Sequence, residues 1–516
     1  MWLRSLEKDL HGEDGRGDSR FNLRYKEDAG SVNNSISKNW IPAMNNESGY
    51  FLIKPKLWQI FLTWFLLFSS NCYAEQFPLG ILGATGKVVA GQSDIEITSV
   101  GEDSPAELAG VSVGDRITGI GDQPFGKHTS NINDGGNGPQ KTLGEALDTV
   151  AAIIDPNKRK LVLNLLRSKE KDQEKDTIRI ACALPYRPSV LQKKGRKLLM
   201  DRAAAHLRKT CVKGSYWDAP AWGLTGDRVL TAWVVVALRA LNDSKDKELL
   251  NKCRAWLRGP KGRCWVPDDP MKQGPASLGN WALTGTAVAL VEMCGGKPGR
   301  DDQQTLEVIC KTLQQRMNEN GLFGHDVSTG YGGKGFNVIN TLSHLAWAMG
   351  AKAGVPIDQT SWELSLGQIK KSVDPDGGIR YWSVWKTGTA DASLRTASMA
   401  LGMDIAGQEP ELCETFSKYL DKHRARTREA HAVGTLGMML APAALWRHDE
   451  AAYQRFLKEW RWYLALMQDH RGKINYIGGK GNNGGDSYLG MDRIICVVAI
   501  MIVAPPEGNL MLFDAS

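Results

Sequence analysis

From residue 188 to residue 512 the chain alternates between two kinds of helical segment. One kind is apolar nearly all round, with small residues and a threonine near its start: RVLTAWVVVALRAL, WALTGTAVALVEM, NVINTLSHLAWAMGA, SLRTASMALGM and AVGTLGMMLAPAAL. The other kind has a single apolar stripe among polar residues, as in KELLNKCRAWL and YQRFLKEWRWYLALM. A helix that is apolar all round is stable only when other helices surround it. The alternation therefore predicts an inner and an outer layer of helices.

The apolar segments recur at similar intervals, which indicates internal repeats. Their threonines are separated by 53, 57, 55 and 39 residues and are Thr231, Thr284, Thr341, Thr396 and Thr435. A sixth apolar segment, YLGMDRIICVVAIMIVA, places Asp492 57 residues after the fifth threonine. Each repeat is a helical hairpin that buries its apolar face only by stacking on its neighbours. With an outer helix for each inner one, the pattern predicts twelve helices in an α6/α6 toroid, and hence a mostly α protein.

Residues 77–185 follow a different pattern, with short alternating runs between glycine turns. DIEITSV, DRITGIGDQPF, KLVLNLLRS and TIRIACAL are typical of strands, while SPAELAG and TLGEALDTVAAII are typical of helices. The stretch SVGEDSPAELAGVSVGDRITGIGDQPF resembles the PDZ domain family: Gly110 ends the short helix, Gly114 and Asp115 make the turn, and Ile117 and Ile120 re-enter the core. The resemblance implies a small α+β domain that binds C-terminal or extended peptides as an added strand.

The resemblance also implies where such a peptide would bind. In the loop PLGILGATG, the backbone donors that would hold a peptide carboxylate belong to Leu79, Gly80, Ile81, Leu82 and Gly83. Extra residues between 83 and 91, and the insertion NINDGGNGPQ, depart from the family pattern. A purely structural domain whose groove is closed by its neighbour is therefore the alternative.

Four of the five loops that lead from an outer to an inner segment carry a glycine followed closely by an aromatic residue. These are GRCW, GLF, GGIRYW and GKINY, and the exception is the shortened fourth loop, HRARTRE. They resemble the repeats of the terpenoid cyclase and prenyltransferase toroid superfamily. Taken with the PDZ-like module and GNNGGDSYLGMD, the chain resembles the family known as domain of unknown function 6288. The resemblance implies an architecture and no established activity.

Polar residues stand near the start of the apolar segments, so the toroid would bring them to one mouth. They are Asp227, Asn280, Asn337, Asp391, His431 and Tyr488, with Asp486 and Asp492 beside the last segment. Asp and Asn are common helix caps worth ~1 kcal/mol each, which explains several of these without a ligand. Capping explains less well the polar residues that fall within otherwise apolar segments, which are His431, Tyr488, Asn340, His344 and Arg395. A buried polar group without a partner costs ~1–3 kcal/mol, so these residues must bond one another or face a wet cavity.

The candidate catalytic residues are His431, Tyr488, Arg395 and Asn337, and the further ligand-binding candidates are Asp227, Asn280, Asp391, Asp486 and Asp492. A Tyr or His base beside an Arg or Asn that holds a carboxylate suits the lysis or hydrolysis of a polysaccharide. The DxDD motif of protonation-initiated terpene cyclisation does not occur, and no inner segment supplies the Asp, Cys and His of a prenyltransferase zinc site. The sequence predicts no metal and no cofactor.

The segment LWQIFLTWFLLFSSNCYAEQ predicts export. Its apolar run, residues 57–68, follows two lysines, precedes a plausible cleavage point at Ala74, and is too short to span a bilayer. Residues 44–74 are accordingly predicted to be a signal peptide of a periplasmic or secreted protein with no membrane span in the mature chain; an uncleaved anchor is the alternative. Residues 1–43 are charged and aperiodic, and are expected to be disordered or a mis-assigned start.

Charge and composition limit the classes of binding partner that the sequence predicts. The chain has 64 Lys and Arg against 57 Asp and Glu, a net charge of +7 that is scattered rather than gathered in a stripe, so nucleic acid is not expected. Peptides at the PDZ-like domain and a glycan polymer at the toroid are the expected partners. The leading interpretation is an exported binding or scaffolding unit of the cell envelope. The alternatives are a carbohydrate-active enzyme with its site at the toroid mouth, and an interaction protein whose toroid centre is plugged.

Overall fold

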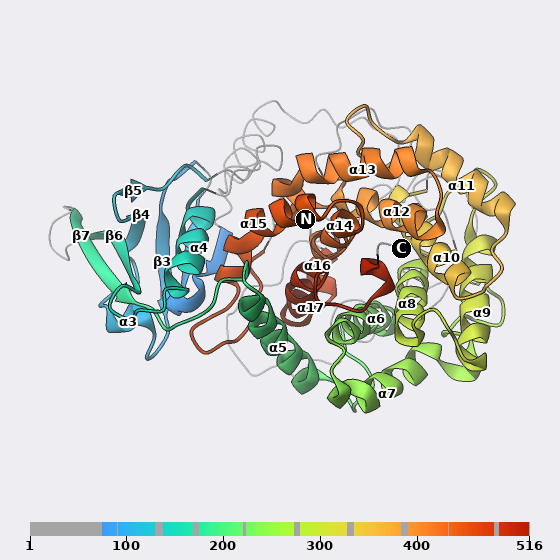
Figure 1. The fold of residues 1–516 in the computed structure, drawn as a ribbon, viewed down its shortest axis with the longest axis horizontal. Helices are drawn as coiled ribbons and strands as arrows, with labels where there is room; N and C mark the ends of the chain where they lie inside the picture. The colour runs from blue at the N-terminus through green and yellow to red at the C-terminus, as the bar shows by residue number, and fades with distance from the viewer. Residues whose placement is uncertain are drawn as a thin grey trace, which may run out of the picture. The chain divides into compact units, whose positions relative to one another are not determined.

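Helices that are buried along nearly their whole length form the inner layer of a closed ring (Figure 1). In the part of the chain that the structure describes, these inner helices are α6 (Gly223–Leu241), α8 (Gly279–Cys294), α10 (Asn337–Lys352), α12 (Ser393–Ala406), α14 (Gly434–His448) and α17 (Met491–Val503). Each packs against the next, and α17 packs against α6, so the layer closes on itself. The predicted toroid is confirmed.

This computed structural model describes residues 75–89, 91–128, 138–168, 175–219, 223–272, 279–327, 335–382, 391–431, 433–478 and 485–514. The predicted signal peptide and the segment before it lie outside the described residues. All the described residues belong to one compact unit that begins at Cys72. None of the helices in these ranges is long and apolar enough to cross a membrane.

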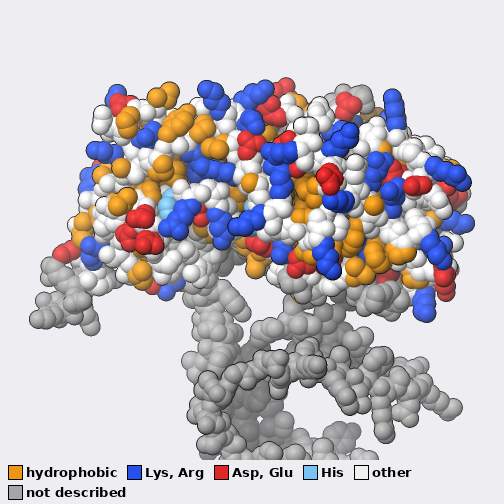
Figure 2. All heavy atoms as spheres, turned by 90° about the horizontal axis from the view of Figure 1, so that it is seen from below, with side chains coloured by type: hydrophobic (Ala, Val, Ile, Leu, Met, Phe, Trp, Pro, Cys, Tyr) orange, Lys and Arg blue, Asp and Glu red, His pale blue; other side chains and the backbone are white. Residues whose placement is uncertain are grey.

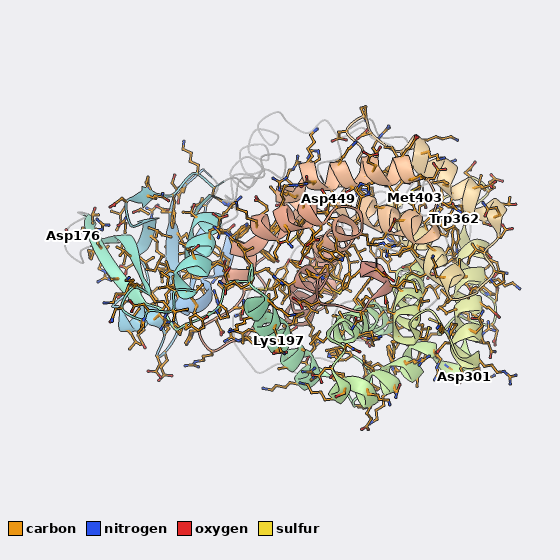
Figure 3. The ribbon with its side chains drawn as sticks, viewed as in Figure 1. Asp176, Lys197, Asp301, Trp362, Met403 and Asp449 are labelled. Carbon is orange, nitrogen blue, oxygen red and sulfur yellow. The ribbon has the colours of Figure 1, made fainter. Side chains whose placement is uncertain are left out.

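Amphipathic helices form the outer layer, each packed on the inner helices. They are α5 (Lys193–Thr210), α7 (Lys247–Arg258), α9 (Arg300–Arg316), α11 (Gln359–Lys371), α13 (Pro410–Lys422) and α15 (Glu450–Leu466). Basic and acidic side chains are interspersed on the face shown in Figure 2. Lys197 of α5 and Asp301 of α9 are exposed, whereas Trp362 of α11 is buried (Figure 3). The Trp362 ring packs edge-on against His344 of α10, with ring centroids 4.5 Å apart.

Polar side chains in the first half of the inner helices fix the loops that arrive from the outer layer. In three repeats a loop N–H donates to such a side chain: Trp217 N to Thr231 Oγ1 at 2.9 Å, Phe323 N to Asn340 Oδ1 at 3.0 Å, and Ile379 N to Thr396 Oγ1 at 3.2 Å. All three acceptors are fully buried. A buried backbone N–H needs a partner, and this explains why a polar residue recurs in helices that are otherwise apolar.

The C-terminal segment closes the end of the ring where the inner helices finish. Residues around the short helix η6 (Met511–Phe513) lie in the middle of the ring in Figure 1. The buried carboxylate of Glu292, in the last turn of α8, accepts the N–H groups of Met511 and Leu512, both at 2.8 Å. Arg447 of α14 donates to the Met511 carbonyl at 2.6 Å. The chain thus seals this end with its own backbone.

An antiparallel sheet with two helices precedes the ring. Its strands are β1 (Glu75–Pro78), β2 (Ala84–Val88), β3 (Ile95–Val100), β4 (Arg116–Ile120), β5 (Gln123–Pro124), β6 (Lys160–Ser168) and β7 (Lys175–Ala183). The order is β1-β2-β3-β4-β6-β7, with β5 paired to β4. The helices are α3 (Pro105–Leu108) and α4 (Gly138–Ala151), and the alternation read from the sequence places Ile95, Ile117 and Leu163 in the core. The predicted α+β domain before the toroid is confirmed.

The sheet domain and the ring share one hydrophobic core, because α4 packs directly on α15. At Gly144 the two helices are so close that an added Cβ would lie 2.5 Å from the Trp462 carbonyl oxygen. Lys141 pairs with Glu459 at 2.5 Å across the same contact. The buried guanidinium of Arg187 donates to the carbonyl oxygens of Gln468 at 3.0 Å and Ala465 at 3.3 Å. The joint is therefore a packed interface rather than a linker.

Gly144→Ala tests this joint, with Gly367→Ala of α11 as the matched control. An added Cβ at Gly367 meets open space, so the control should raise the free energy of unfolding by roughly 0.5–1 kcal/mol through reduced backbone entropy. Gly144→Ala should instead lower it by roughly 1–3 kcal/mol, because the helices must separate. Calorimetric unfolding of both variants measures the difference. Equal stabilisation by both would show that α4 and α15 are not in contact.

Candidate functional site

Arg395, in the first turn of α12, ties together three segments at the mouth of the ring. Its Nε donates to the Ile379 carbonyl at 2.8 Å, its Nη1 to the His431 carbonyl at 3.3 Å, and its Nη2 to Asp391 Oδ1 at 2.9 Å. The guanidinium also lies over the Tyr381 ring, 5.5 Å from the centroid. Because the side chain is only 1% exposed and its charge is paired, Arg395 positions the loops and does not face a ligand.

The imidazole rings of His431 and His325 lie beside Arg395. The His431 ring packs edge-on against Tyr381, with centroids 4.5 Å apart. Burial lowers the pKa of His431, and the nearby Asp391 carboxylate partly opposes that shift. Burial and the neighbouring His431 lower the pKa of His325 to about 4. Both rings are therefore neutral at pH 7.

The tautomer of His325 follows from its hydrogen bond. Its Nδ1 lies 2.9 Å from Trp281 Nε1, and an indole N–H is only a donor. Nδ1 therefore accepts, and the proton of the neutral ring sits on Nε2. His325 thus offers a hydrogen-bond donor at the mouth, while the second imidazole, His431, keeps a nitrogen that can accept.

Aromatic rings join these groups into one patch. Phe336 lies 4.4 Å from His325, 5.6 Å from Tyr381 and 6.5 Å from Trp382, measured between ring centroids. We call the whole patch the rim cluster; it comprises Trp281, His325, Phe336, Tyr381, Trp382, Asp391, Arg395 and His431. Its members His325, Tyr381, Trp382, Asp391 and His431 are partly exposed. Its members Trp281, Phe336 and Arg395 are buried beneath them. The cluster therefore has a buried floor and an accessible rim.

The two predicted asparagines position the loops that carry the cluster. Asn337 Nδ2 donates to the Arg380 carbonyl at 2.8 Å. Asn280 Nδ2 donates to the carbonyls of Gly324 at 3.0 Å and Asp326 at 2.9 Å, and its Oδ1 accepts from Arg316 at 3.1 Å. Both asparagine side chains are fully buried, so they act on the loops and have no surface for a ligand.

The remaining predicted mouth residues have separate surroundings. Asp227 accepts from the Ala219 N–H at 2.6 Å, and burial raises its pKa. Asp492 is exposed in the first turn of α17, with its carboxylate 3.5 Å from His206 of the outer helix α5. Tyr488 is partly exposed at the end of the short helix α16 (Gly485–Tyr488). The structure thus unites Asp391, Arg395 and His431, whereas Asp227 and Asp492 interact with other residues.

Asp486 caps a different helix from the one expected from its position before α17. Its Oδ1 accepts from Thr435 N at 3.0 Å and Thr435 Oγ1 at 2.7 Å, at the start of α14, and its Oδ2 accepts from the Tyr476 hydroxyl at 2.9 Å. Burial raises the pKa of Asp486 to about 6. With both oxygens bonded and the residue only 3% exposed, its role is to fix α14 against the last loop.

The residues predicted to hold a peptide carboxylate are buried in the sheet domain. Leu79, Ile81 and Leu82 are at most 3% exposed. Three amides of the loop are already bonded internally: Leu79 N to Ala84 O, Leu82 N to Leu79 O and Gly83 N to Gly80 O. An added Cβ at Gly80 would lie 2.6 Å from the Ala465 carbonyl, so α15 covers the loop. This geometry favours the structural alternative.

Strand β1 completes the closure of that groove. It pairs antiparallel with β2, with Phe77 opposite Gly86, while β3 pairs with the other edge of β2. A peptide that joins a PDZ domain adds to a free edge of this strand. Because both edges of β2 are paired within the chain, the position of an incoming peptide strand is already occupied.

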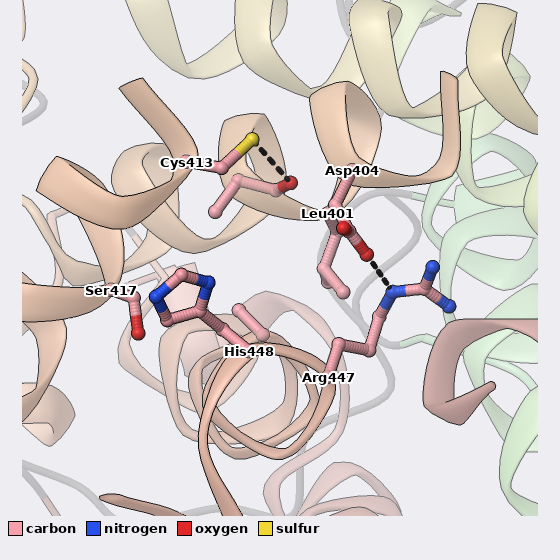
Figure 4. Close-up of a pocket in the computed structure, with 8 residues that line it drawn as sticks. Leu401, Asp404, Cys413, Ser417, Arg447 and His448 are labelled. Atoms are coloured by element: carbon pink, nitrogen blue, oxygen red, sulfur yellow. Dashed lines mark hydrogen bonds and ion pairs between the residues drawn. The ribbon is translucent and has the colours of Figure 1, made fainter. Parts of the chain in front are cut away.

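A shallow pocket lies at the other end of the ring (Figure 4). Ala400, Leu401 and Asp404 of α12, Cys413 and Ser417 of α13, and Ala444, Arg447 and His448 of α14 line it. The Arg447 and Asp404 side chains form an ion pair across it. None of the predicted site residues lines this pocket, and its charged groups are paired with each other.

Sequence reasoning missed His325, Phe336 and Tyr381. His325 stands alone in a loop, and nothing in its neighbourhood sets it apart from a surface histidine. Tyr381 belongs to the recurring glycine-aromatic signal of GGIRYW, which indicates a repeat loop and not a binding residue. The useful signal would have been that this aromatic comes ten residues before the polar pair Asp391 and Arg395 of the following helix.

The fold and the rim cluster define an α/α toroid fused to a PDZ domain. The chain belongs to the family described as domain of unknown function (DUF6288), whose model matches residues 222–513, and a PDZ domain model matches residues 96–134. The comparison with curated proteins gives no match.

Solved structures with a similar fold include a type II terpene cyclase from Scytonema. In complex with its substrate geranylgeranyl dihydroxybenzoate, it has a TM-score of 0.40 and 16% identity over 60% of this chain and 97% of that chain. The apo form has a TM-score of 0.39 and 15% identity over 60% and 98%. A protein from Actinoplanes has a TM-score of 0.42 and 12% identity over 60% and 98%. These likenesses concern the fold alone.

The depressed pKa of His325 predicts a pH-dependent stability. The unfolded chain binds the proton near pH 6.5 and the folded chain only near pH 4, so stability is full above pH 6.5 and falls as the pH drops toward 4. Between pH 7 and pH 5 this residue should account for a loss of at most about 2 kcal/mol. His325→Gln, which keeps an acceptor for Trp281, should reduce that loss in chemical denaturation. His448→Gln, which replaces an exposed histidine, should leave that loss of stability unchanged. An identical pH dependence in the unaltered protein and both variants would contradict the assignment of the loss to His325.

Proposed function

We propose that the mouth of the toroid binds a saccharide unit of a polysaccharide chain. The observation that carries this proposal is the rim cluster, in which partly exposed Tyr381 and Trp382 stand beside His325, Asp391 and His431. An aromatic face packs well on the apolar C–H face of a sugar ring, and the adjacent polar groups can bond its hydroxyls. Binding sites generally combine apolar walls with a few convergent polar groups in this way.

The PDZ domain serves in this proposal as a fixed support for the ring. PDZ domains in general bind peptides, but here β1 and α15 cover the strand and the loop that would do so. The support is rigid because it shares a core with α15, the outer helix that packs on α14. Export, as predicted from the leader, would bring the mouth into contact with extracellular polysaccharide.

The carboxylates at the mouth are better suited to binding a saccharide than to hydrolysing one. Glycoside hydrolysis usually needs two carboxyl groups, one of them protonated to act as an acid. At the mouth, Asp391 is 2.9 Å from Arg395, and Asp326 is 2.7 Å from Arg316. Each carboxylate is held by a buried arginine, so neither is free to approach a glycosidic oxygen.

A second candidate function is elimination at the same site, and the neutral state of His431 favours it. In such a reaction His431 would take the proton from the carbon next to a sugar carboxylate, a C=C bond would form, and the neighbouring C–O bond would break. The Nε2–H of His325 lies on the same rim as a donor for the departing oxygen. An imidazole that is neutral at pH 7 can act as a base without first losing a proton.

Binding is tested by calorimetric titration of the protein with a panel of neutral and acidic oligosaccharides. Trp382→Ala should weaken binding about fivefold or more, because a stacked ring contributes roughly 1 kcal/mol or more. Trp446→Ala is the matched control, since Trp446 is also partly exposed but lies near the far end of α14. If no oligosaccharide binds, or if both variants bind as the unaltered protein does, the proposal is wrong.

Elimination is tested by the ultraviolet absorbance of the unsaturated sugar that it produces from an acidic polysaccharide. His431→Gln should slow product formation by about a hundredfold or more while binding changes little, since general base catalysis contributes on that scale. His448→Gln, at the opposite end of the ring, should leave the rate unchanged. Absence of unsaturated product from the unaltered protein would leave a binding site without this chemistry.

A further inference from the structure

Arg228, near the start of α6, is a buried cation whose guanidinium has no hydrogen-bonded counter-ion among the described residues; Asp227 acts on it only through its charge. The residue is 9% exposed, and its Nε has no hydrogen-bond partner. Among the residues that the structure describes, none forms a hydrogen bond or an ion pair with this guanidinium. The adjacent carboxylate of Asp227 is turned to the Ala219 N–H, 2.6 Å away. Buried charges are normally paired, so this arrangement needs an explanation.

Other buried arginines of the ring show what pairing looks like in this protein. Arg316 lies 2.7 Å from Asp326, and Arg395 lies 2.9 Å from Asp391. Arg228 instead lies over the indole ring of Trp265, 5.0 Å from the centroid. An arginine held by its face on an aromatic ring keeps the N–H groups at its edge available for an anion.

The register of the inner helices places Arg228 at the level of the rim cluster. A Cβ added to Gly285 of α8 would lie 3.4 Å from the Ala232 side chain of α6, so these two positions are level. The two helices are parallel, and both begin at the mouth of the ring. One turn nearer their starts, Arg228 on α6 is level with Trp281 on α8, which carries the hydrogen bond to His325.

We propose that Arg228 and Trp265 form an anion-binding subsite that continues the rim cluster, and that the saccharide bound at the mouth is acidic. This inference rests on the proposed function and names its ligand class: a glycan that carries carboxylate or sulfate groups. Trp265 holds the guanidinium by its face, and the guanidinium supplies a planar fork that matches the geometry of a carboxylate.

The test compares tetragalacturonate with its methyl ester, which has the same sugar backbone without the charges. The unaltered protein should bind the acid about tenfold to a hundredfold more tightly than the ester, and less tightly as salt is added. Arg228→Gln should abolish this preference and leave the affinity for the ester unchanged. Arg228→Lys should retain part of it, because the charge stays but the fork is lost. A sulfated oligosaccharide of equal length distinguishes sulfate from carboxylate recognition.

The control is Arg239→Gln, at the opposite end of α6, where the arginine donates to Asn242. It should bind both ligands as the unaltered protein does. Equal affinity of the unaltered protein for acid and ester, or an undiminished preference in Arg228→Gln, would overturn the inference and leave saccharide binding intact. Failure of every oligosaccharide to bind would instead overturn the proposed function. If Arg228→Gln does not fold, the preference of the unaltered protein and its reduction in Arg228→Lys decide the matter.

Discussion

The burial of nearly all-apolar helices is the constraint on which the rest of this structure depends. Such helices are stable only with neighbours on every side, so they close into a ring inside a second layer. The loops that enter the ring must then bury backbone N–H groups, and side chains such as Thr231, Asn340 and Thr396 accept them. The mouth is polar for the same reason. A binding site there needs only that some of these polar and aromatic groups remain accessible, as His431 and Trp382 do.

The repeating helices and the PDZ-like sheet could be predicted because their signals are local: periodicity, turn glycines and a threonine in each apolar segment. The capping role of Asp486 could be predicted, but not the helix that it caps, because Thr435 lies 51 residues away in sequence. For Arg395 the polarity within an apolar helix was visible, whereas its internal partners were not. His325 escaped prediction since a lone loop histidine becomes informative only when Trp281 and His431 are seen beside it. Long-range packing decides such cases, and no local pattern encodes it.

The closed groove of the PDZ domain also results from packing between parts of the chain that are distant in sequence. A free strand edge and a cup of backbone donors attract any extended segment, and the chain supplies its own in β1. The glycines that a peptide-binding loop needs also allow the close approach of α15, as at Gly80. The sequence motif of a peptide-binding domain can therefore be present while other parts of the same chain cover the peptide-binding surface. This explains why the family motif is evident although the predicted carboxylate loop is buried.

Closure of the inner layer by α17 against α6 has a consequence for how the protein is made. A ribosome synthesises α6 long before α17, so the first inner helix lacks one of its two flanking neighbours until α17 has emerged. Its exposed apolar face is a target for chaperones and for misassembly during that interval. The ring is consequently a fold that forms late, since its inner layer closes only when α17 packs against α6.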